Sequence, residues 1–193
     1  MIKRDYLKQP IRKQIKELRM HWQMYFLPAA LFYGLAVWHL LSIHPSVKPE
    51  MAAYVKNIDL GGFIIAILMA VVILQIKRQF FSLRFARTFV AEAIQHQADI
   101  SDGDVVRNIF RVWKAKFSTV WLLGMLIILV GVASYWLTFS PAINFHIYFV
   151  IGSFSMVINF PRQDLFIDLP WQIAEARRDK DAAERTAMEK NEK

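Results

Sequence analysis

Three histidines and one aspartate are the residues whose types could support metal or haem chemistry. His39 lies near the end of a first apolar run and His44 just beyond it, Asp59 precedes a second run, and His146 lies near the start of a fourth. Two histidines at one depth on different helices, such as His39 and His146, could ligate a b-type haem. Three histidines together with a carboxylate could hold a metal ion. The competing interpretation is a local hydrogen bond for each side chain. No second histidine pair supports a site, so we expect neither metal nor other cofactor.

The remaining motifs give no sign of catalysis. The sequence contains no Walker, G-x-S-x-G, HExxH or Rossmann pattern. It has no cysteine, which excludes thiolate-bound zinc, iron–sulfur clusters and covalently attached haem. An acidic turn at 97–104 lacks the spacing of an EF-hand loop, and we expect Ser101 and Asp104 to cap a helix there. The sequence therefore predicts a protein that is not an enzyme.

Four long apolar runs must position these residues. The runs contain no Asp, Glu, Lys or Arg, and they span Trp22–Ile43, Leu60–Ile76, Ser118–Phe139 and Ala142–Phe160. Each is near the roughly 20 residues that a helix needs to cross about 30 Å of hydrocarbon. The first run is expected to be a retained span because no small-x-small cleavage site follows it. The predicted fold is all-α: an integral membrane protein whose domain 22–160 is a bundle of four transmembrane helices.

The distribution of positive charge predicts the orientation of this bundle. Residues 1–21 hold seven Lys and Arg and residues 77–117 hold eight, whereas the two other loops hold only Lys48 and Lys56. Basic segments that flank membrane helices remain cytoplasmic. We therefore expect a bacterial inner-membrane protein with both termini inside. The net charge of +8 is attributed to topology and to anionic lipid of the inner leaflet, and no nucleic acid is expected as a partner.

The N-terminal arm, residues 1–21, has the pattern of a basic amphipathic helix. Ile11, Ile15 and Leu18 share one face with Trp22. We expect this helix to lie on the inner membrane surface, with a docking helix for a partner as the alternative. The basic side chains proposed to contact lipid or a partner are Arg12, Lys13, Lys16 and Arg19.

The segment 77–117 is predicted to form a cytoplasmic helical hairpin. No helix breaker occurs between Ile76 and Gly103, so the second helix is expected to continue to about Gln97. Aromatic residues mark its apolar surface, which we expect to contact a partner or lipid: Phe81, Phe85, Phe89 and Trp113. The tail, residues 161–193, is expected to be cytoplasmic and either a solvated helix or disordered.

Small and polar residues form stripes along the apolar runs. Small side chains let membrane helices approach closely, and we expect this role for Gly62, Ala66, Ala70, Gly124 and Gly131. The fourth run carries a polar stripe that should not face lipid, made of Asn144, Tyr148, Gly152, Ser155 and Asn159. Packing with interhelical hydrogen bonds is the favoured role of the stripe; a ligand or ion path and a subunit interface are the alternatives.

These features predict a non-catalytic protein that acts as a subunit, accessory protein or scaffold of a larger membrane assembly, of a transport, secretion or inhibitor (immunity) type. Its expected partners are other membrane-protein subunits or a second copy. A transporter or channel subunit for a small solute is the first alternative, because the apolar runs lack the ionisable groups of a pump. A haem- or quinone-linked membrane anchor is the second.

Overall fold

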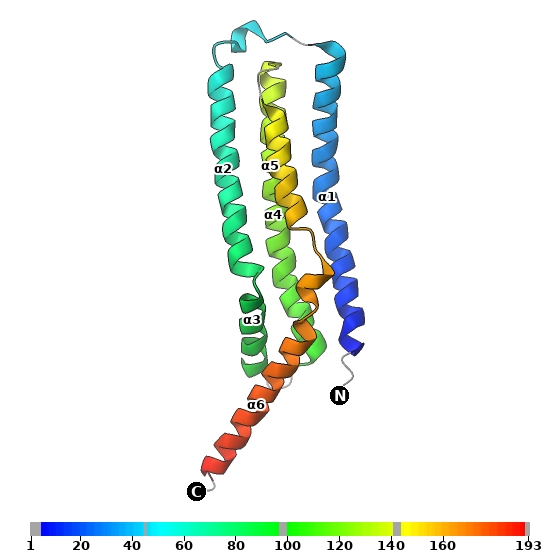
Figure 1. Cartoon of the computed structure of the whole chain (residues 1–193), viewed down its shortest axis with the longest axis vertical. Helices are drawn as coiled ribbons and strands as arrows, with labels where there is room; N and C mark the ends of the chain where they lie inside the picture. The colour runs from blue at the N-terminus through cyan, green and yellow to red at the C-terminus, as the bar shows by residue number, and fades with distance from the viewer. Residues whose placement is uncertain (1–4, 45, 97–99, 141–143, 192–193) are drawn as a thin grey trace. The chain divides into compact units, whose positions relative to one another are not determined.

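The computed structural model describes residues 5–44, 46–96, 100–140 and 144–191, and all regular structure in these ranges is helical (Figure 1). The prediction of an all-α fold is therefore confirmed. Two short 3-10 turns, η1 (Pro49–Met51) and η2 (Gln163–Phe166), lie between longer helices. The six α-helices are α1 (Asp5–Ile43), α2 (Val55–Phe80), α3 (Leu83–His96), α4 (Asp102–Thr138), α5 (Phe145–Ile158) and α6 (Leu169–Asn191).

Three of these helices, α1, α2 and α4, are long and apolar enough to cross a membrane. The helix found in the fourth apolar run, α5, has only 14 residues and rises about 21 Å, which is less than the roughly 30 Å of a hydrocarbon core. The start of that run, up to residue 143, lies outside the described residues. The structure is thus compatible with a membrane helical bundle that has three long apolar helices and a shorter one.

The chain divides into two compact units. We call Arg19–Ile76 with Lys116–Phe160 the membrane unit, and Met1–Leu18 with Lys77–Ala115 and Pro161–Lys193 the charged unit. Helices α1, α2 and α4 each contribute to both. The divisions fall close to the positions where the basic segments of the sequence meet its apolar runs.

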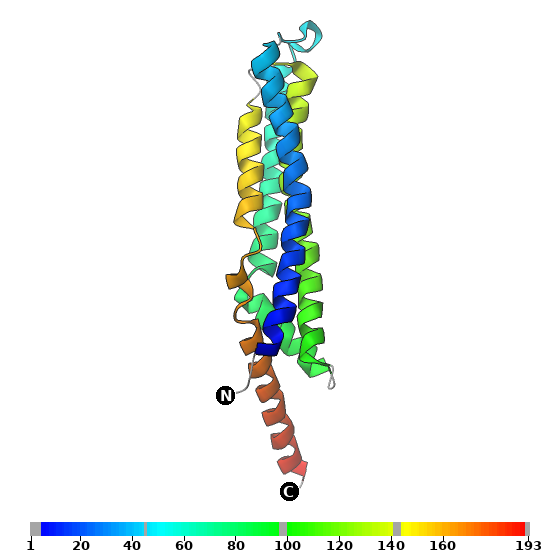
Figure 2. The same cartoon turned by 90° about the vertical axis from the view of Figure 1, so that its right-hand side faces the viewer.

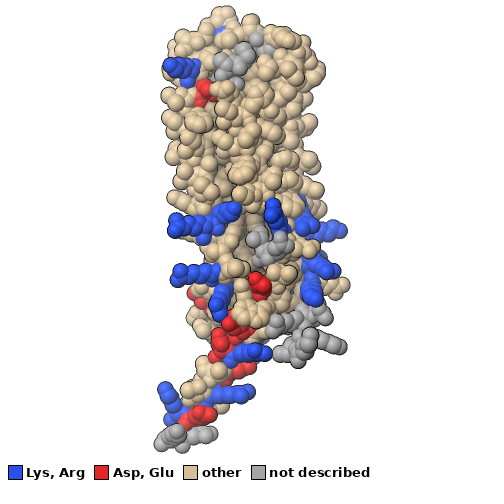
Figure 3. Space-filling model, viewed as in Figure 1, with Lys and Arg blue, Asp and Glu red and all other residues tan. Residues whose placement is uncertain are grey.

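In the membrane unit, parts of α1, α2, α4 and α5 run side by side (Figures 1 and 2). In the sequence of this unit, charged residues occur only next to the apolar runs: Arg19 and Lys116 on one side, and Lys48, Glu50, Lys56 and Asp59 in the segment between the first two runs. The face drawn in Figure 3 accordingly shows a broad region without Lys, Arg, Asp or Glu. The surface of the runs is apolar, with exposed residues such as Leu31, Leu68 and Phe154. Such a surface suits contact with lipid tails.

Helix α4 forms the centre of the membrane unit. Half of its most apolar stretch is buried, against 11% for α1 and 17% for α2. Trp121, Ile127 and Tyr135 of α4 are almost fully buried. The other helices therefore pack around α4 and leave their outer faces exposed.

The charged unit has its own apolar core. The α3 residues Val90 and Ile94 and the α4 residue Ile109 are fully buried. Phe166 of η2 stacks on Phe110 with ring centroids 4.9 Å apart and meets the edge of Trp113 at 5.0 Å. Helices α3 and α6 pack against each other. This part of the chain thus folds around aromatic side chains that lie far apart in sequence.

The predicted continuation of the second helix to about Gln97 is wrong. Helix α2 ends at Phe80, and α3 begins at Leu83. The backbone N–H of Phe85 donates to Ser82 Oγ at 3.2 Å, so Ser82 acts as the N-cap of α3. The indole of Trp113 donates to the carbonyl oxygen of Phe80 at 3.0 Å, which satisfies an end carbonyl of α2. These two contacts account for the break without glycine or proline.

The cap predicted for the returning helix is confirmed. The Asp104 N–H donates to Ser101 Oγ at 3.2 Å, and the Ser101 hydroxyl donates to Asp104 Oδ2 at 2.7 Å. The two side chains therefore support each other at the start of α4, as in a capping box. Residues 97–99 of the predicted acidic turn lie outside the described residues.

The N-terminal arm differs from the predicted surface helix. From Asp5 on, the arm is the first part of α1 and continues without a break into the apolar run. Leu7, Ile11, Ile15 and Leu18 are each less than 8% exposed, so the apolar face of the arm is buried in protein and not against lipid. The amphipathic pattern of this arm correctly marks a buried face, but periodicity alone does not distinguish protein from lipid as the buried environment.

Candidate functional site

The structure gives two of the candidate histidines separate tyrosine partners. His39 Nδ1 lies 2.9 Å from Tyr135 Oη, and His146 Nδ1 lies 2.8 Å from Tyr33 Oη. The Tyr33 ring also stacks on Phe149, with centroids 3.7 Å apart. Each imidazole thus has a local hydrogen-bond partner at Nδ1, and the two rings contact different tyrosines.

The two other candidates also lie apart from any shared site. Asp59 accepts hydrogen bonds from the Tyr148 hydroxyl at its backbone oxygen (2.8 Å) and at Oδ1 (3.3 Å). His44 is exposed at the end of α1. Among the described residues, no three His, Cys, Asp or Glu side chains gather closely enough to hold a metal ion. The predicted metal candidates are therefore not brought together.

The polar stripe of α5 is mostly buried and hydrogen-bonded within protein. Ser155 Oγ donates to Ile151 O at 2.8 Å, and Asn159 Nδ2 donates to Ser155 O at 2.8 Å. Ser155 and Asn159 are 9% and 3% exposed, and Tyr148 is 1% exposed. Only Asn144, which precedes the helix, is exposed. The Ser155 and Asn159 side chains thus bond to carbonyls one turn earlier in α5 itself, whereas Tyr148 donates to another helix, at Asp59 of α2.

Glycines bring α4 and α5 into backbone contact. A Cβ atom built on Gly152 would lie 2.5 Å from Gly124 O, and one built on Gly124 would lie 3.1 Å from Gly152 O. A Cβ on Gly131 would lie 2.5 Å from Tyr148 Cβ. Such distances leave no room for a side chain at these positions. Close helix approach here depends on residues of minimal size.

The small residues of α2 contribute to the same packing. A Cβ on Gly62 would lie 2.9 Å from the Tyr148 hydroxyl oxygen. Ala66 is fully buried, whereas Ala70 is half-buried. The contact is therefore closest near the Tyr148 hydroxyl, which also bonds Asp59 one turn earlier in α2.

Two tryptophans satisfy end carbonyls of α5, a role that the sequence analysis missed. Trp22 Nε1 of α1 donates to Met156 O at 3.1 Å, and Trp121 Nε1 of α4 donates to Asn159 O at 3.2 Å. The last carbonyls of a helix have no partner within it. Both indoles therefore cap α5 from neighbouring helices. The only sequence signal was the presence of tryptophans near the inner ends of two apolar runs.

Lys48 has the same function at the end of α4. Its ammonium donates to Trp136 O at 3.2 Å and lies 4.2 Å from the centre of the Phe139 ring. Its backbone N–H donates to Thr138 O at 3.1 Å. A cation is favourable at a helix C-terminus because the end carbonyls carry partial negative charge. Sequence analysis counted Lys48 only as a loop charge.

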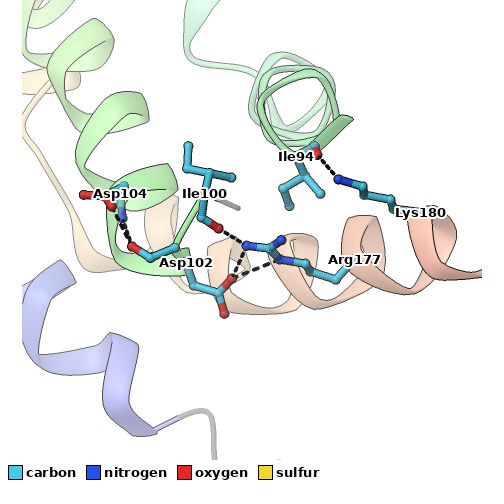
Figure 4. Close-up of polar contacts among 7 residues, drawn as sticks. Ile94, Ile100, Asp102, Asp104, Arg177 and Lys180 are labelled. Carbon is cyan, nitrogen blue, oxygen red and sulfur yellow. Dashed lines mark hydrogen bonds and ion pairs between the residues drawn. The ribbon is translucent and has the colours of Figure 1, made fainter. Parts of the chain in front are cut away.

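In the charged unit, α6 is fastened by two cationic side chains (Figure 4). Arg177 donates to Asp102 Oδ1 at 3.2 and 3.1 Å and also to the backbone oxygen of Ile100. Lys180 Nζ donates to Ile94 O, in the last turn of α3, at 3.1 Å. Arg177 and Lys180 thus bind the segment between α3 and α4, and we call these contacts the α6 clamp.

Beyond the α6 clamp, α6 makes no buried contact. All residues from 181 to 190 are exposed, although the segment remains helical. Glu175, which precedes the α6 clamp along the helix, forms an ion pair with Arg87 at 2.7 Å. The tail expected to be either a solvated helix or disordered is therefore helical up to residue 191, with its first half packed and its second half free of the core.

The predicted partner surfaces are only partly exposed. Arg12, Lys13 and Lys16 are exposed, and Arg19 is half-buried with its guanidinium 5.4 Å from the Phe160 ring centre. The phenylalanines proposed with them are half-buried: Phe81, Phe85 and Phe89.

Trp113, which was predicted with these phenylalanines to contact a partner or lipid, is buried in the charged unit. The side chain is 5% exposed because its ring packs on Phe110 and Phe166. Its indole N–H donates to the carbonyl oxygen of Phe80. Helical spacing alone assigned it to an apolar face, and that face is the core of the charged unit.

The arrangement defines an all-helical protein with apolar helices suited to a membrane and a folded charged unit. Comparison with family models, curated proteins and solved structures gives no match. Its function is therefore inferred from its own contacts.

Proposed function

We propose that the chain is a non-catalytic, multi-pass protein of a bacterial inner membrane, with four spans and both termini in the cytoplasm. It acts as a subunit, accessory protein or scaffold of a larger membrane assembly, of a transport, secretion or inhibitor type. The observation that carries this proposal is the second half of α6. Residues 181–190 are helical and wholly exposed, and they follow directly on the α6 clamp formed by Arg177 and Lys180.

An exposed helix of this kind has no role in the core. The segment contains acidic and basic residues together with Met188, which is 65% exposed. A helix that is polar all round requires surface ion pairs or a bridging role for its stability. Lys180 and Glu184 lie 4.0 Å apart, which is a weak support because surface pairs contribute little. We therefore assign the segment to contact with another protein.

The interior of the membrane unit supports a structural role in preference to a transport role. Its buried stripe residues Tyr148, Ser155 and Asn159 are engaged in hydrogen bonds with the protein. No Asp, Glu, Lys or Arg occurs within the four apolar runs, whereas proton and ion pathways normally require such groups. The basic residues concentrated in 1–21 and 77–117 support cytoplasmic placement of the charged unit.

The test uses the absence of cysteine from the chain. Ala187→Cys places a single thiol on the exposed end of α6, and Ala53→Cys places one on the exposed loop after α1. In native membranes, a bifunctional thiol crosslinker is expected to join Ala187→Cys to a partner subunit or a second copy. A membrane-impermeant thiol reagent is expected to label Ala53→Cys from outside and to leave Ala187→Cys unlabelled.

A truncation after Lys180 sharpens the test, because it keeps the α6 clamp and removes only the exposed part. The truncated protein is expected to remain folded and to lose the partner in gentle detergent purification. The proposal fails if Ala187→Cys crosslinks to nothing, if it is labelled from outside, or if the truncation keeps the same partner.

A solute transporter or channel subunit is the second candidate, favoured by one observation. A hollow of about 360 Å³ at one end of the membrane unit is lined by Asp59, Asn144 and Tyr148, among others. A path from it would have to pass Ser155 and Asn159. Water-soluble thiol reagents are expected to reach Asn144→Cys and not Ser155→Cys or Asn159→Cys. Labelling at all three positions would favour the transporter.

A further inference from the structure

The charged unit contains a groove of about 300 Å³ between the first part of α1 and the stretch from η2 to the start of α6. The α1 wall contains two basic and two apolar residues, and the other wall is mostly apolar. The lining of the groove includes Ile11, Arg12, Phe166, Ile167 and Trp171. None of them belongs to the α6 clamp or to the exposed end of α6.

The lining combines a cationic edge with an exposed apolar wall. Lys8 and Arg12 are the charged residues of the lining, and no carboxylate is part of it. Ile167 is 73% exposed and Trp171 is 47% exposed, although both belong to the folded segment before and at the start of α6. A ligand that carries a negative group next to a hydrocarbon chain would complement both parts of this surface.

The position of the groove along the chain indicates where such a ligand resides. Ile15 precedes Trp22, where the first apolar run begins, by seven residues, or about 10 Å of helix. The opposite wall begins at Gln163, five residues after the end of α5. Tryptophan is enriched at the level of lipid headgroups. Both walls therefore lie next to the points where the chain leaves its apolar helices.

We propose that this groove binds one anionic phospholipid of the inner leaflet. The phosphate contacts Arg12, and an acyl chain lies along the exposed side chains of Ile167 and Trp171. This inference rests on the proposed cytoplasmic placement of the charged unit, but not on the proposed partner of α6, because it uses a different surface. An acidic protein segment would match the charge of Arg12, but it is not favoured by the exposed isoleucine and tryptophan beside the apolar runs.

The experiment measures lipid retained by the full-length protein. The purified protein is exchanged into detergent with phosphatidylglycerol or phosphatidylcholine, and bound lipid is counted by native mass spectrometry. The wild type is expected to retain phosphatidylglycerol in preference to phosphatidylcholine. Arg12→Gln is expected to weaken phosphatidylglycerol retention about fivefold, because one Lys or Arg contributes about that factor near anionic lipid.

Two further variants make the result specific. Lys13→Gln removes the neighbouring exposed cation, which does not line the groove, and is expected to leave retention unchanged. Trp171→Ala is expected to reduce retention while Arg12 is intact. Circular dichroism of each variant verifies that the helices remain folded.

Several outcomes would overturn the proposal. Equal retention of the two lipids by the wild type would show that the groove does not select negative charge. Equal losses from Arg12→Gln and Lys13→Gln would assign the effect to general surface charge. Displacement of the lipid by inorganic phosphate would identify a free anion as the ligand. Co-purification of an acidic protein that only Arg12→Gln removes would identify a protein ligand instead.

Discussion

The membrane unit and the charged unit satisfy their helix ends in different ways. In the membrane unit, the neutral indoles of Trp22 and Trp121 donate to end carbonyls of α5. In the charged unit, Lys180 donates to Ile94 O in the last turn of α3, and Arg177 donates to Ile100 O shortly after it. A buried cation loses its hydration, whereas an indole brings an apolar ring with its single donor. The environment of each helix end thus determines which donor is used.

Lys48 shows the same rule at the end of the membrane unit. It is a cation that caps α4, but its ammonium lies where the side chain is exposed. A charged donor therefore occurs where water reaches it. Trp113 is the complementary case, because it is an indole that caps α2 within the aromatic core of the charged unit.

The two units also differ in how their helices pack. Gly124 and Gly152 place backbone against backbone in the membrane unit. The charged unit instead buries large rings, such as Phe110 and Phe166. Lipid tails are as apolar as the side chains, so close contact must supply the attraction in the first case. In the charged unit, removal of apolar surface from water supplies the attraction.

The largest expected effect comes from filling the glycine contact. Gly152→Ala places a methyl group against Gly124 O and Ile128, where neither can move freely. We expect a loss of about 3 kcal/mol in the free energy of unfolding, at the upper end of overpacking costs. Thermal or SDS-induced unfolding in detergent, followed by circular dichroism, measures it.

Gly34→Ala is the matched control for that substitution, because a Cβ at Gly34 meets nothing within 4 Å. It is expected to leave stability unchanged or to raise it by up to about 1 kcal/mol through helix propensity. Equal destabilisation by the two variants would contradict the assignment of close packing to Gly152.

Removing an indole donor is expected to have the next largest effect. Trp121→Phe keeps a ring in the core and leaves Asn159 O without this donor. We expect a loss of about 2 kcal/mol, the cost of an unsatisfied buried acceptor. Trp136→Phe, at a half-exposed site, should change stability by less than about 0.5 kcal/mol in the same unfolding assay. Similar losses of stability from the two substitutions would contradict the capping role assigned to Trp121.

Added salt is expected to weaken the hydrogen bonds made by the cationic donors. Arg177→Gln should weaken the attachment of α6 by about 1–2 kcal/mol, because Arg177 forms charge-assisted bonds at a partly exposed site. Hydrogen exchange of α6 amides measures the loss. Raising ionic strength should reduce the protection of α6 in the wild type but not the protection given by Trp121 to α5. An equal salt response of the two helices would contradict the comparison.

The smallest expected effect is a stabilisation. His44 ends α1 with φ of 49°, in the left-handed region that glycine adopts without a Cβ penalty. His44→Gly is expected to raise the free energy of unfolding by about 1 kcal/mol. Phe139 has a similar φ of 53°, but its ring packs on His39 and Lys48, so Phe139→Gly should not stabilise. Thermal unfolding of both variants compares them.

The sequence was sufficient to predict the helical class and the cap at Ser101, because apolar runs and local caps depend on residues that are close together in the sequence. It did not predict the break before Leu83, where Ser82 acts with Trp113 from 31 residues away. Contacts between distant residues have no local pattern. For the same reason, sequence reasoning missed the indole caps of α5 and the α6 clamp.

The candidate site shows a similar limit. Similar depth along the helices was correctly taken as a condition for a shared histidine site, but it does not fix the direction of each ring. In the structure, Nδ1 of His39 contacts Tyr135 and Nδ1 of His146 contacts Tyr33, so the two rings face different partners. The direction depends on helix rotation, which the period of an apolar run does not determine when all faces are apolar.

The shortness of α5 has a consequence for the bilayer itself. In a four-span arrangement, its 14 helical residues cover about 21 Å, some 9 Å less than an average hydrocarbon core. Local thinning of the membrane is one of the ways in which hydrophobic mismatch of this sign is relieved. Headgroups would then be drawn inward beside α5, and the protein would accumulate in thinner regions of the membrane.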